Sequence, residues 1–135
     1  MKIDTGYNRT GIEATDFELA DAVIKAAAGS AKTNLKGFLT HSGQTYQANS
    51  IDEIMRRHFD SLLKLKNLKN RYGGMYGNLE ISMGDTPAAS VCENFGGVDE
   101  LRPGNFVFYD LMQQNHGVCS FDDIAVKMVC PVVAI

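Results

Sequence analysis

The sequence predicts an α/β fold built on parallel strands. Short apolar segments alternate with amphipathic helical segments over about the first 90 residues, and each apolar segment leads into a polar, glycine-containing loop. This alternation is typical of a parallel sheet whose strands are joined by right-handed crossover helices. At 135 residues the chain is too short for a complete eight-stranded α/β barrel of about 250 residues, so we expect one domain or part of one.

The first eleven residues predict the end of a buried strand followed by a polar, glycine-hinged loop that carries Arg9. A helix is predicted next, because Thr15 and Glu18 have the spacing of a capping box and apolar residues recur at helical intervals up to Gly29. Residues 35–40 are apolar and bounded by polar loops, which predicts a second buried strand.

A longer helix is predicted after Ser50, which has the spacing of a second capping box with Glu53. Its apolar stripe continues to residues 72–74 (Tyr-Gly-Gly), where we expect the helix to end. Residues 79–83 predict the third strand, and Pro87 suits the first position of a short helix that follows it.

The pattern changes in the last third of the chain. A fourth, shorter strand is predicted at residues 98–101. Residues 105–109 and 124–135 have no strong helix between them, and the second of these segments is rich in valine and other strand-forming residues. This composition predicts the start of a separate β domain.

Charge and hydrophobicity exclude several classes of protein. Lys and Arg number 13 against 16 Asp and Glu, for a net charge of −3, and no basic cluster is dense enough to follow a phosphate backbone, so we expect no nucleic-acid partner. A hydrophobic content of 44% excludes disorder, and no apolar run approaches the roughly 18 residues of a membrane span. The polar start is no signal peptide. We therefore expect a cytoplasmic protein that contacts no membrane and keeps its three cysteines reduced.

Polar residues gather where each predicted strand ends. Four clusters follow the four strands, at residues 4–11, 41–46, 82–87 and 102–105. In a parallel sheet or barrel the carboxyl ends of the strands face one pocket, so we expect the clusters to meet there. Residues 84–87 could hold a phosphate through backbone N–H groups, a hydroxyl and a helix N-terminus.

Each cluster alone also has a plain structural explanation. Residues 84–87 could be an ordinary strand-to-helix turn, and His41 a loop histidine with satisfied hydrogen bonds. Arg9 and Arg102 could form surface ion pairs. The convergence of four clusters on one side of the sheet is what favours a ligand site.

Four segments together resemble a known enzyme family: KIDTGYNRTGI at 2–12, GFLTHSGQTY at 37–46, SMGDTP at 82–87 and ELRPGNFVFYD at 100–110. In order and spacing they resemble the D-threonine aldolase and D-serine dehydratase-like branch of the fold-type III pyridoxal 5′-phosphate (PLP) enzymes. The resemblance implies the second half of a PLP-binding (β/α)8 barrel of the TIM type at residues 1–110. Residues 111–135 would then be the start of a C-terminal β domain.

The resemblance also implies a set of cofactor-binding residues. Arg9 would contact the phenolic oxygen of PLP, and His41 would pack against its pyridine ring. Arg102 matches an arginine that faces the ring nitrogen in the racemases, where a cation disfavours protonation and weakens the electron sink. The phosphate would be surrounded by Tyr46, Gly84, Thr86, Gly104 and Asn105.

Two parts of the family's site have no counterpart in the sequence. Family members hold PLP as a Schiff base on a lysine that lies N-terminal to anything present here, and Lys2 does not match it. A divalent metal is possible in the complete enzyme, but its His and Cys or Asp ligands would lie beyond Ile135, and His116 with Cys119 is a fortuitous pair. We therefore assign no catalytic residue and no metal ligand, and expect a fragment that is inactive alone.

The expected function is that of part of a PLP-dependent lyase or aldolase that acts on a D-amino acid such as D-threonine or D-serine. We expect it to form a homodimer. An alanine racemase is one alternative, and a noncatalytic PLP-binding barrel protein is another, against which the strand-rich residues 124–135 argue. A third alternative is a half barrel that pairs with itself, because exposed strand edges need a partner.

Overall fold

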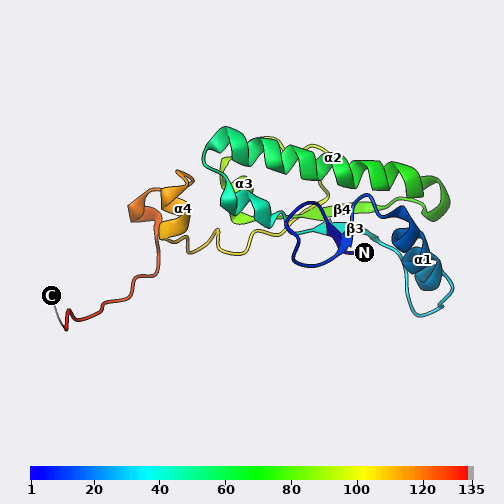
Figure 1. The fold of residues 1–135 in the computed structure, drawn as a ribbon, viewed down its shortest axis with the longest axis horizontal. Helices are drawn as coiled ribbons and strands as arrows, with labels where there is room; N and C mark the ends of the chain where they lie inside the picture. Colours follow the sequence, from blue (N-terminus) through cyan, green and yellow to red (C-terminus); the bar gives the residue numbers. More distant parts are fainter. Residues whose placement is uncertain (134–135) are drawn as a thin grey trace.

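A computed structural model describes residues 1–133 and shows a parallel sheet flanked by helices (Figure 1). In the main sheet the order is β3-β4-β5, and every neighbouring pair is parallel. The first strand adjoins β3 through a parallel bridge between Lys2 and Leu39. The strands are β1 (Ile3–Asp4), β3 (Gly37–Thr40), β4 (Glu80–Met83) and β5 (Glu100–Leu101). The predicted parallel α/β arrangement is confirmed, with each strand shorter than expected.

A short extra strand, β2 (Ile12–Glu13), pairs in parallel with β1 and was not predicted. The chain can return alongside β1 because Gly11 adopts a φ of +114°, and a Cβ there would lie 2.8 Å from the backbone nitrogen of Asp4. The loop between β1 and β2 is therefore closed at its base by strand pairing.

The first helix, α1 (Phe17–Ala28), begins one residue later than the predicted capping box requires. Asp16 is its N-cap, and the Asp16 carboxylate accepts the backbone N–H of Leu19 at 3.0 Å. Thr15 instead donates its hydroxyl to Glu13. Aspartate and threonine are both good N-caps, so the local sequence does not decide between Thr15 and Asp16. The contacts that each side chain makes in the folded chain decide it.

The long helix α2 (Ile51–Tyr76) starts as predicted and ends later than predicted. Ser50 is the N-cap and accepts the backbone N–H of Glu53 at 3.2 Å, but the Glu53 carboxylate returns to the backbone N–H of Asn49. The expected end at residues 72–74 is wrong, because the helix continues through both glycines. Its last residue is Tyr76, and the C-cap is Gly77, whose φ of +80° residues other than glycine rarely adopt.

Two short helices follow the carboxyl ends of β3 and β4. They are the 3-10 helix η1 (Gly43–Gln47) and α3 (Thr86–Val91). Pro87 is the second residue of α3 and not the first, because Asp85 acts as N-cap and accepts the backbone N–H of Ala88 at 2.8 Å. Both helices therefore begin directly at the edge where the predicted polar clusters lie.

The C-terminal part contains a short helix that the sequence did not predict, α4 (Leu111–Asn115), capped by Asp110, and the 3-10 helix η2 (Phe121–Asp123). Residues 105–109 form turns, and residues 124–133 form no strand. Ala134 and Ile135 lie outside the described residues. The β domain therefore stays a prediction, and the strand argument against a noncatalytic barrel protein loses its support.

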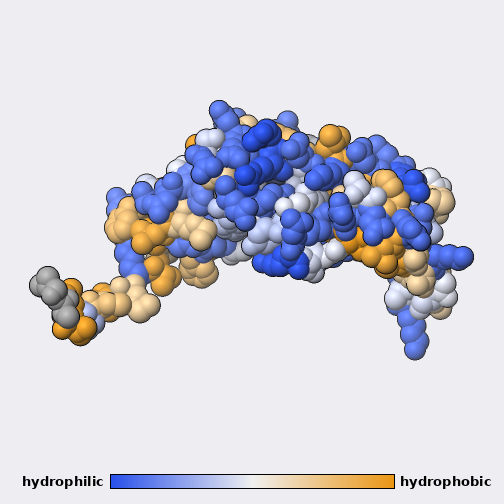
Figure 2. Space-filling model, in the orientation of Figure 1, coloured by the Kyte–Doolittle hydropathy of each residue, from blue (hydrophilic) through white to orange (hydrophobic). Residues whose placement is uncertain are grey.

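The main core lies between the sheet and helices α1 and α2. It combines Ile3, Phe38, Ile81 and Met83 of the strands with the buried faces of the two helices. A second cluster around Ile54 joins α2 to α3. In Figure 1 α2 lies along the sheet, and the chain after α4 extends away from it. Figure 2 shows apolar side chains gathered around α4 and the segment that follows. No helix within residues 1–133 is long and apolar enough to span a membrane.

Candidate functional site

Three of the four predicted clusters meet through direct contacts at the carboxyl edge of the sheet. The His41 Nδ1 lies 3.1 Å from the carbonyl oxygen of Gly84, which links the ends of β3 and β4. The backbone N–H of Asn105, after β5, donates to the Thr86 hydroxyl at 2.9 Å. The first cluster joins them through Tyr7, whose ring centroid lies 5.5 Å from that of His41.

The loop after β1 is organised by Asp4. One carboxylate oxygen accepts the backbone N–H groups of Gly6, Tyr7 and Asn8 at 2.8, 2.9 and 3.1 Å. Partial burial acts to raise the pKa of Asp4, but these hydrogen bonds outweigh it and the pKa is lowered. Asn8 has a φ of +59°, so the loop turns sharply before Arg9. The loop thus has a defined backbone shape.

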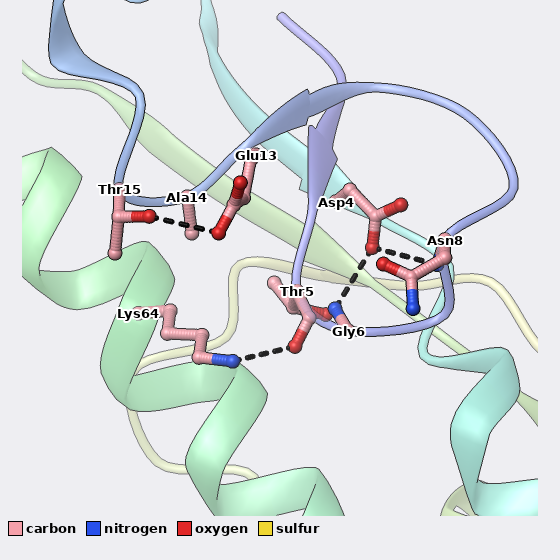
Figure 3. A pocket seen from close by; sticks show the side chains of 8 residues that line it. All are labelled: Asp4, Thr5, Gly6, Asn8, Glu13, Ala14, Thr15 and Lys64. Atoms are coloured by element: carbon pink, nitrogen blue, oxygen red, sulfur yellow. Dashed lines mark hydrogen bonds between the residues drawn. The ribbon is translucent and has the colours of Figure 1, made fainter.

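A small pocket lies beside this loop, as Figure 3 shows. Its volume is about 70 Å³, and Lys64 of α2 crosses it to donate to the Thr5 carbonyl oxygen at 2.7 Å. None of the eight predicted cofactor-binding residues lines it. At this size it holds only a few water molecules, so it is not the cofactor site.

Arg9 extends from this loop over an aromatic ring. Its guanidinium carbon lies 5.0 Å from the centroid of the Tyr7 ring, within the range of a cation–π contact. The Tyr7 ring in turn meets His41 edge to face, with an interplanar angle of 70°. The ring of Tyr46 also lies near that of His41, with centroids 6.1 Å apart and an interplanar angle of 36°. Arg9, His41 and Tyr46 therefore lie together, as predicted, with Tyr7 as an additional member.

The electrostatics around His41 favour its neutral form. Burial lowers the pKa of the imidazole, although the hydrogen bond to the Gly84 carbonyl acts in the opposite direction. The positive charges of Arg9, Lys2 and Arg102 lower the pKa further. Because a carbonyl only accepts hydrogen bonds, Nδ1 carries the proton and Nε2 is left with a lone pair. This edge of the sheet is thus electropositive and suited to an anion.

The predicted phosphate-binding residues form a hydrogen-bonded group. The backbone N–H of Thr86 donates to the Tyr46 hydroxyl at 3.3 Å, and the Thr86 hydroxyl accepts from Asn105. Each of these hydroxyl groups retains a proton that can be donated to an anion. Thr86 is completely buried, so in this conformation it supports Asn105, whereas Tyr46 is partly accessible.

The two predicted glycines have different surroundings. A Cβ at Gly84 would lie 2.5 Å from the carbonyl carbon of Arg102, so glycine permits the close approach of the segments after β4 and β5. Gly104 faces open space, with no atom within 4 Å of an added Cβ. Gly84 is thus required by packing, and Gly104 leaves room beside Asn105.

Arg102 is held on the sheet rather than free in solvent. Its Nε donates to the Ser82 hydroxyl at 2.6 Å, and its Nη2 donates to the Thr40 carbonyl oxygen at 3.1 Å. Glu100 lies 3.5 Å away as an ion-pair partner. These contacts fix the guanidinium at the carboxyl ends of β3 and β4. Its role beside a pyridine nitrogen stays a prediction.

Buried polar side chains adjoin the site and hydrogen-bond to one another. The sequence analysis did not predict these contacts. The hydroxyls of Thr5 and Thr40 lie 3.1 Å apart, and the Thr45 hydroxyl donates to the Asp85 carboxylate at 2.7 Å. Burial raises the pKa of Asp85 to about 6, while Thr45 and Ala88 partly oppose this. The position of Asp85 before Thr-Pro is an N-cap signal that could have identified it.

His116 directs Nδ1 to the carbonyl oxygen of Met112 at 2.6 Å. Across residues 1–133, no group of three or more His, Cys, Asp or Glu side chains is placed to hold a metal ion. We therefore describe no metal site in this part of the chain.

Parallel strands joined by helices, with polar side chains at the carboxyl edge of the sheet, are typical of α/β proteins that bind a ligand at that edge. The family model for the N-terminal domain of alanine racemase matches residues 1–111. The chain therefore belongs to this family of fold-type III PLP-dependent enzymes.

Two relatives of this chain are dehydratases that are named for D-amino acids. The chain is 30% identical to D-threo-3-hydroxyaspartate dehydratase from Delftia sp. (strain HT23), over 98% of the chain and 35% of that protein. It is 29% identical to D-serine dehydratase from Dictyostelium discoideum, over the full chain and 36% of that protein. The chain thus spans about a third of the length of these relatives.

Solved structures agree with the fold. The Delftia dehydratase superposes with a TM-score of 0.77, covering 92% of this chain and 33% of the dehydratase. D-Threonine aldolase from Filomicrobium marinum superposes with a TM-score of 0.74 at 21% identity, covering 85% of this chain and 31% of the aldolase. At this level of identity, the similarity to the aldolase shows a shared fold and nothing about function.

Proposed function

We propose that this chain forms part of the cofactor site of a PLP-dependent lyase that acts on 3-hydroxy-D-amino acids, by aldol cleavage or dehydration. The observation that carries the proposal is the convergence of four strand-end loops around His41. The names of the two dehydratases support the substrate class, because serine and 3-hydroxyaspartate both carry a hydroxyl on the carbon next to the α-carbon. Residues 1–110 would belong to the PLP barrel and 111–135 to the following domain.

The donor set fits PLP, an anion with a flat aromatic ring. Tyr46 offers a hydroxyl proton, and Gly104 leaves open space beside Asn105 for a phosphate. The imidazole of His41 offers a flat neutral surface for the pyridine ring. Arg9 and Arg102 supply positive charge near His41. This combination of a polar cluster, a neutral ring and two cations matches the chemistry of the cofactor.

When bound, PLP would supply an electron sink for the negative charge that develops at the α-carbon of an amino acid. The residues of this chain would bind and orient the cofactor. Arg9 would stabilise the phenolic oxygen as an anion, and Arg102 would disfavour a proton on the ring nitrogen, because a like charge lies nearby. His41 would restrict the tilt of the ring.

The 135-residue chain is proposed to bind the cofactor without turnover. None of its lysines matches the place of the lysine that holds PLP in the family. Binding alone is therefore the property to test, and an analogue without an aldehyde avoids reaction with surface lysines. Pyridoxine 5′-phosphate meets this requirement.

The test is a calorimetric titration of the chain with pyridoxine 5′-phosphate. Tyr46→Phe removes a hydroxyl donor and should weaken binding about tenfold or more, since hydrogen bonds to charged groups contribute roughly 1.5–3 kcal/mol. Tyr109→Phe is the matched control, because the Tyr109 hydroxyl contacts Ser90. Absence of binding by the unchanged chain, or equal affinity for both variants, would overturn the assignment.

A covalent readout tests the proposed inactivity. The chain is mixed with PLP, reduced with borohydride and digested, and the peptides are analysed by mass spectrometry. We expect only scattered, substoichiometric labelling of exposed lysines. Stoichiometric labelling of a single lysine, together with turnover of D-serine or D-threonine, would show that the chain is active by itself.

A further inference from the structure

Tyr7 belongs to the loop after β1, and its ring packs against the start of η1. Its ring fills the space that a Cβ of Gly43 would need, so the ring and the start of η1 are in close contact. The ring meets His41 edge to face with centroids 5.5 Å apart, and Arg9 lies over it at 5.0 Å. Residues of two strand-end loops, Arg9 of the first and His41 and Gly43 of the second, therefore contact one aromatic ring.

The backbone of Tyr7 is fixed as well as its ring. Its N–H donates to the Asp4 carboxylate, which also accepts the flanking N–H groups of Gly6 and Asn8. The ring is half-buried, whereas Arg9 is exposed. Within residues 1–133, the Arg9 side chain makes no hydrogen bond or ion pair, and its guanidinium lies over the Tyr7 ring. The position of the guanidinium thus depends on Tyr7.

We infer that Tyr7 is a positioning residue of this site, whose ring holds Arg9 and His41 at a fixed separation for a planar, phosphorylated pyridine ligand. The inference rests on the proposed function for the identity of that ligand. An exposed cation–π contact favours the arginine rotamers that keep the guanidinium over the ring. Gly43 has a specific role in this arrangement, because any side chain there would displace the ring.

A simpler role for Tyr7 would be to cover His41 from water. The two roles differ in their effect on Arg9. If Tyr7 only covers His41, an apolar side chain of similar bulk replaces it and Arg9 keeps its influence on the imidazole. If Tyr7 holds Arg9, the same replacement removes that influence.

The first test is a double-mutant cycle read at His41 by NMR titration. The charged groups that act on His41 are Lys2, Arg9 and Arg102. Arg9→Gln should raise the pKa of His41 in the unchanged background, because a nearby positive charge is removed. In the Tyr7→Leu background, Arg9→Gln should have no effect. Tyr7→Phe keeps the ring and should behave like the unchanged chain.

The pKa of His41 measured by NMR is also the readout for the control variants. Arg56→Gln removes an exposed arginine on α2 that pairs with Glu53, and it should leave the pKa of His41 unchanged in every background. Gly43→Ala displaces the Tyr7 ring without removing it, and in this background Arg9→Gln should affect the pKa of His41 as it does in the Tyr7→Leu background. If Tyr7→Leu does not fold, Gly43→Ala provides the same test. An equal response to Arg9→Gln in all backgrounds would overturn the role of Tyr7.

The second test compares two ligands. Tyr7→Leu should weaken pyridoxine 5′-phosphate binding about three- to tenfold and leave inorganic phosphate binding unchanged. The reason is that Tyr7 positions residues proposed to contact the pyridine ring of the ligand and not its phosphate. Equal losses for both ligands would contradict the inference and indicate general disruption. If the unchanged chain binds no pyridoxine 5′-phosphate, the proposed function fails, while the NMR cycle still decides whether Tyr7 positions Arg9.

Discussion

Asp85 lies beneath the proposed phosphate-binding groups with its carboxylate almost completely buried. One oxygen accepts the Thr45 hydroxyl and the backbone N–H of Ala88, and the other oxygen has no hydrogen-bond partner among residues 1–133. Burial disfavours the charged form, so the pKa is raised to about 6. The folded chain therefore binds this proton more tightly than the unfolded chain does.

Asp85 should make stability depend on pH. Between about pH 4 and 6 the folded state holds more protons than the unfolded state, so stability falls as the pH rises. A shift from 3.8 to about 6 corresponds to a loss on the order of 3 kcal/mol. Asp85→Asn keeps an oxygen acceptor and stays neutral, and its stability relative to the unchanged chain should rise by that amount from pH 4 to pH 7.5.

Urea denaturation of both proteins at several pH values measures this difference. The control is Asp16→Asn, the same exchange at the exposed N-cap of α1. If the stability difference between Asp85→Asn and the unchanged chain stays constant across the pH range, the Asp85 carboxylate is accessible to solvent and the structural explanation is wrong.

Individual residues show what the sequence could predict. The strand-end rule brought His41, Thr86 and Asn105 together correctly, because parallel strands place their following loops at one edge. Tyr7 and Asp85 were missed, since their contacts with Gly43 and Thr45 join residues about 40 positions apart. No local pattern encodes such packing. The cofactor roles of the eight residues stay predictions.

At the scale of elements, α2 shows where local rules fail. Two adjacent glycines predicted its end, yet the helix continues past them to Tyr76. Tyr72 is buried and donates its hydroxyl to Asp21 of α1 at 2.6 Å, which anchors this part of α2 to the core. Tertiary packing of this kind offsets the poor helix propensity of glycine, at about 1 kcal/mol per residue.

The glycines of α2 make a prediction with an internal control. Added Cβ atoms at Gly73 and Gly74 meet nothing within 4 Å, so the double exchange to alanine should stabilise the chain by about 1–2 kcal/mol. Gly77 is also unobstructed but has a φ of +80° and a ψ of −149°, so Gly77→Ala should destabilise by about 1–3 kcal/mol. Urea denaturation measures both. Destabilisation by the double exchange would place the end of α2 before Gly73.

At the scale of the molecule, the two faces of the sheet differ. Phe38, Ile81 and Met83 are buried on the face towards α2. A hollow of about 250 Å³ on the other side is lined by strand and adjoining residues, including Leu39, Ser82 and Glu100. From the short length of the chain and its parallel strand order, the sequence predicted a partial barrel with exposed strand edges. The sequence could not predict which side chains line the solvent-exposed face of the sheet.

We expect the open face to pair with a second copy of the chain. Leu39 is half-buried there, and burying it in a dimer would remove apolar surface from water, at about 25 cal/mol per Å². Light scattering coupled to size-exclusion chromatography should give twice the mass of the chain over a tenfold concentration range. Leu39→Glu should shift the equilibrium towards monomer, because dimer formation would then bury an unpaired carboxylate at the interface.

Val129→Lys is the matched control for the dimer, because Val129 is 96% exposed in the segment after η2. It should leave the dimer intact if the open sheet face is the interface. Dissociation by Val129→Lys, with a persistent dimer in Leu39→Glu, would place the interface at the apolar surface around α4 instead. A monomer at every concentration, or a heterogeneous mixture of aggregates, would contradict pairing altogether.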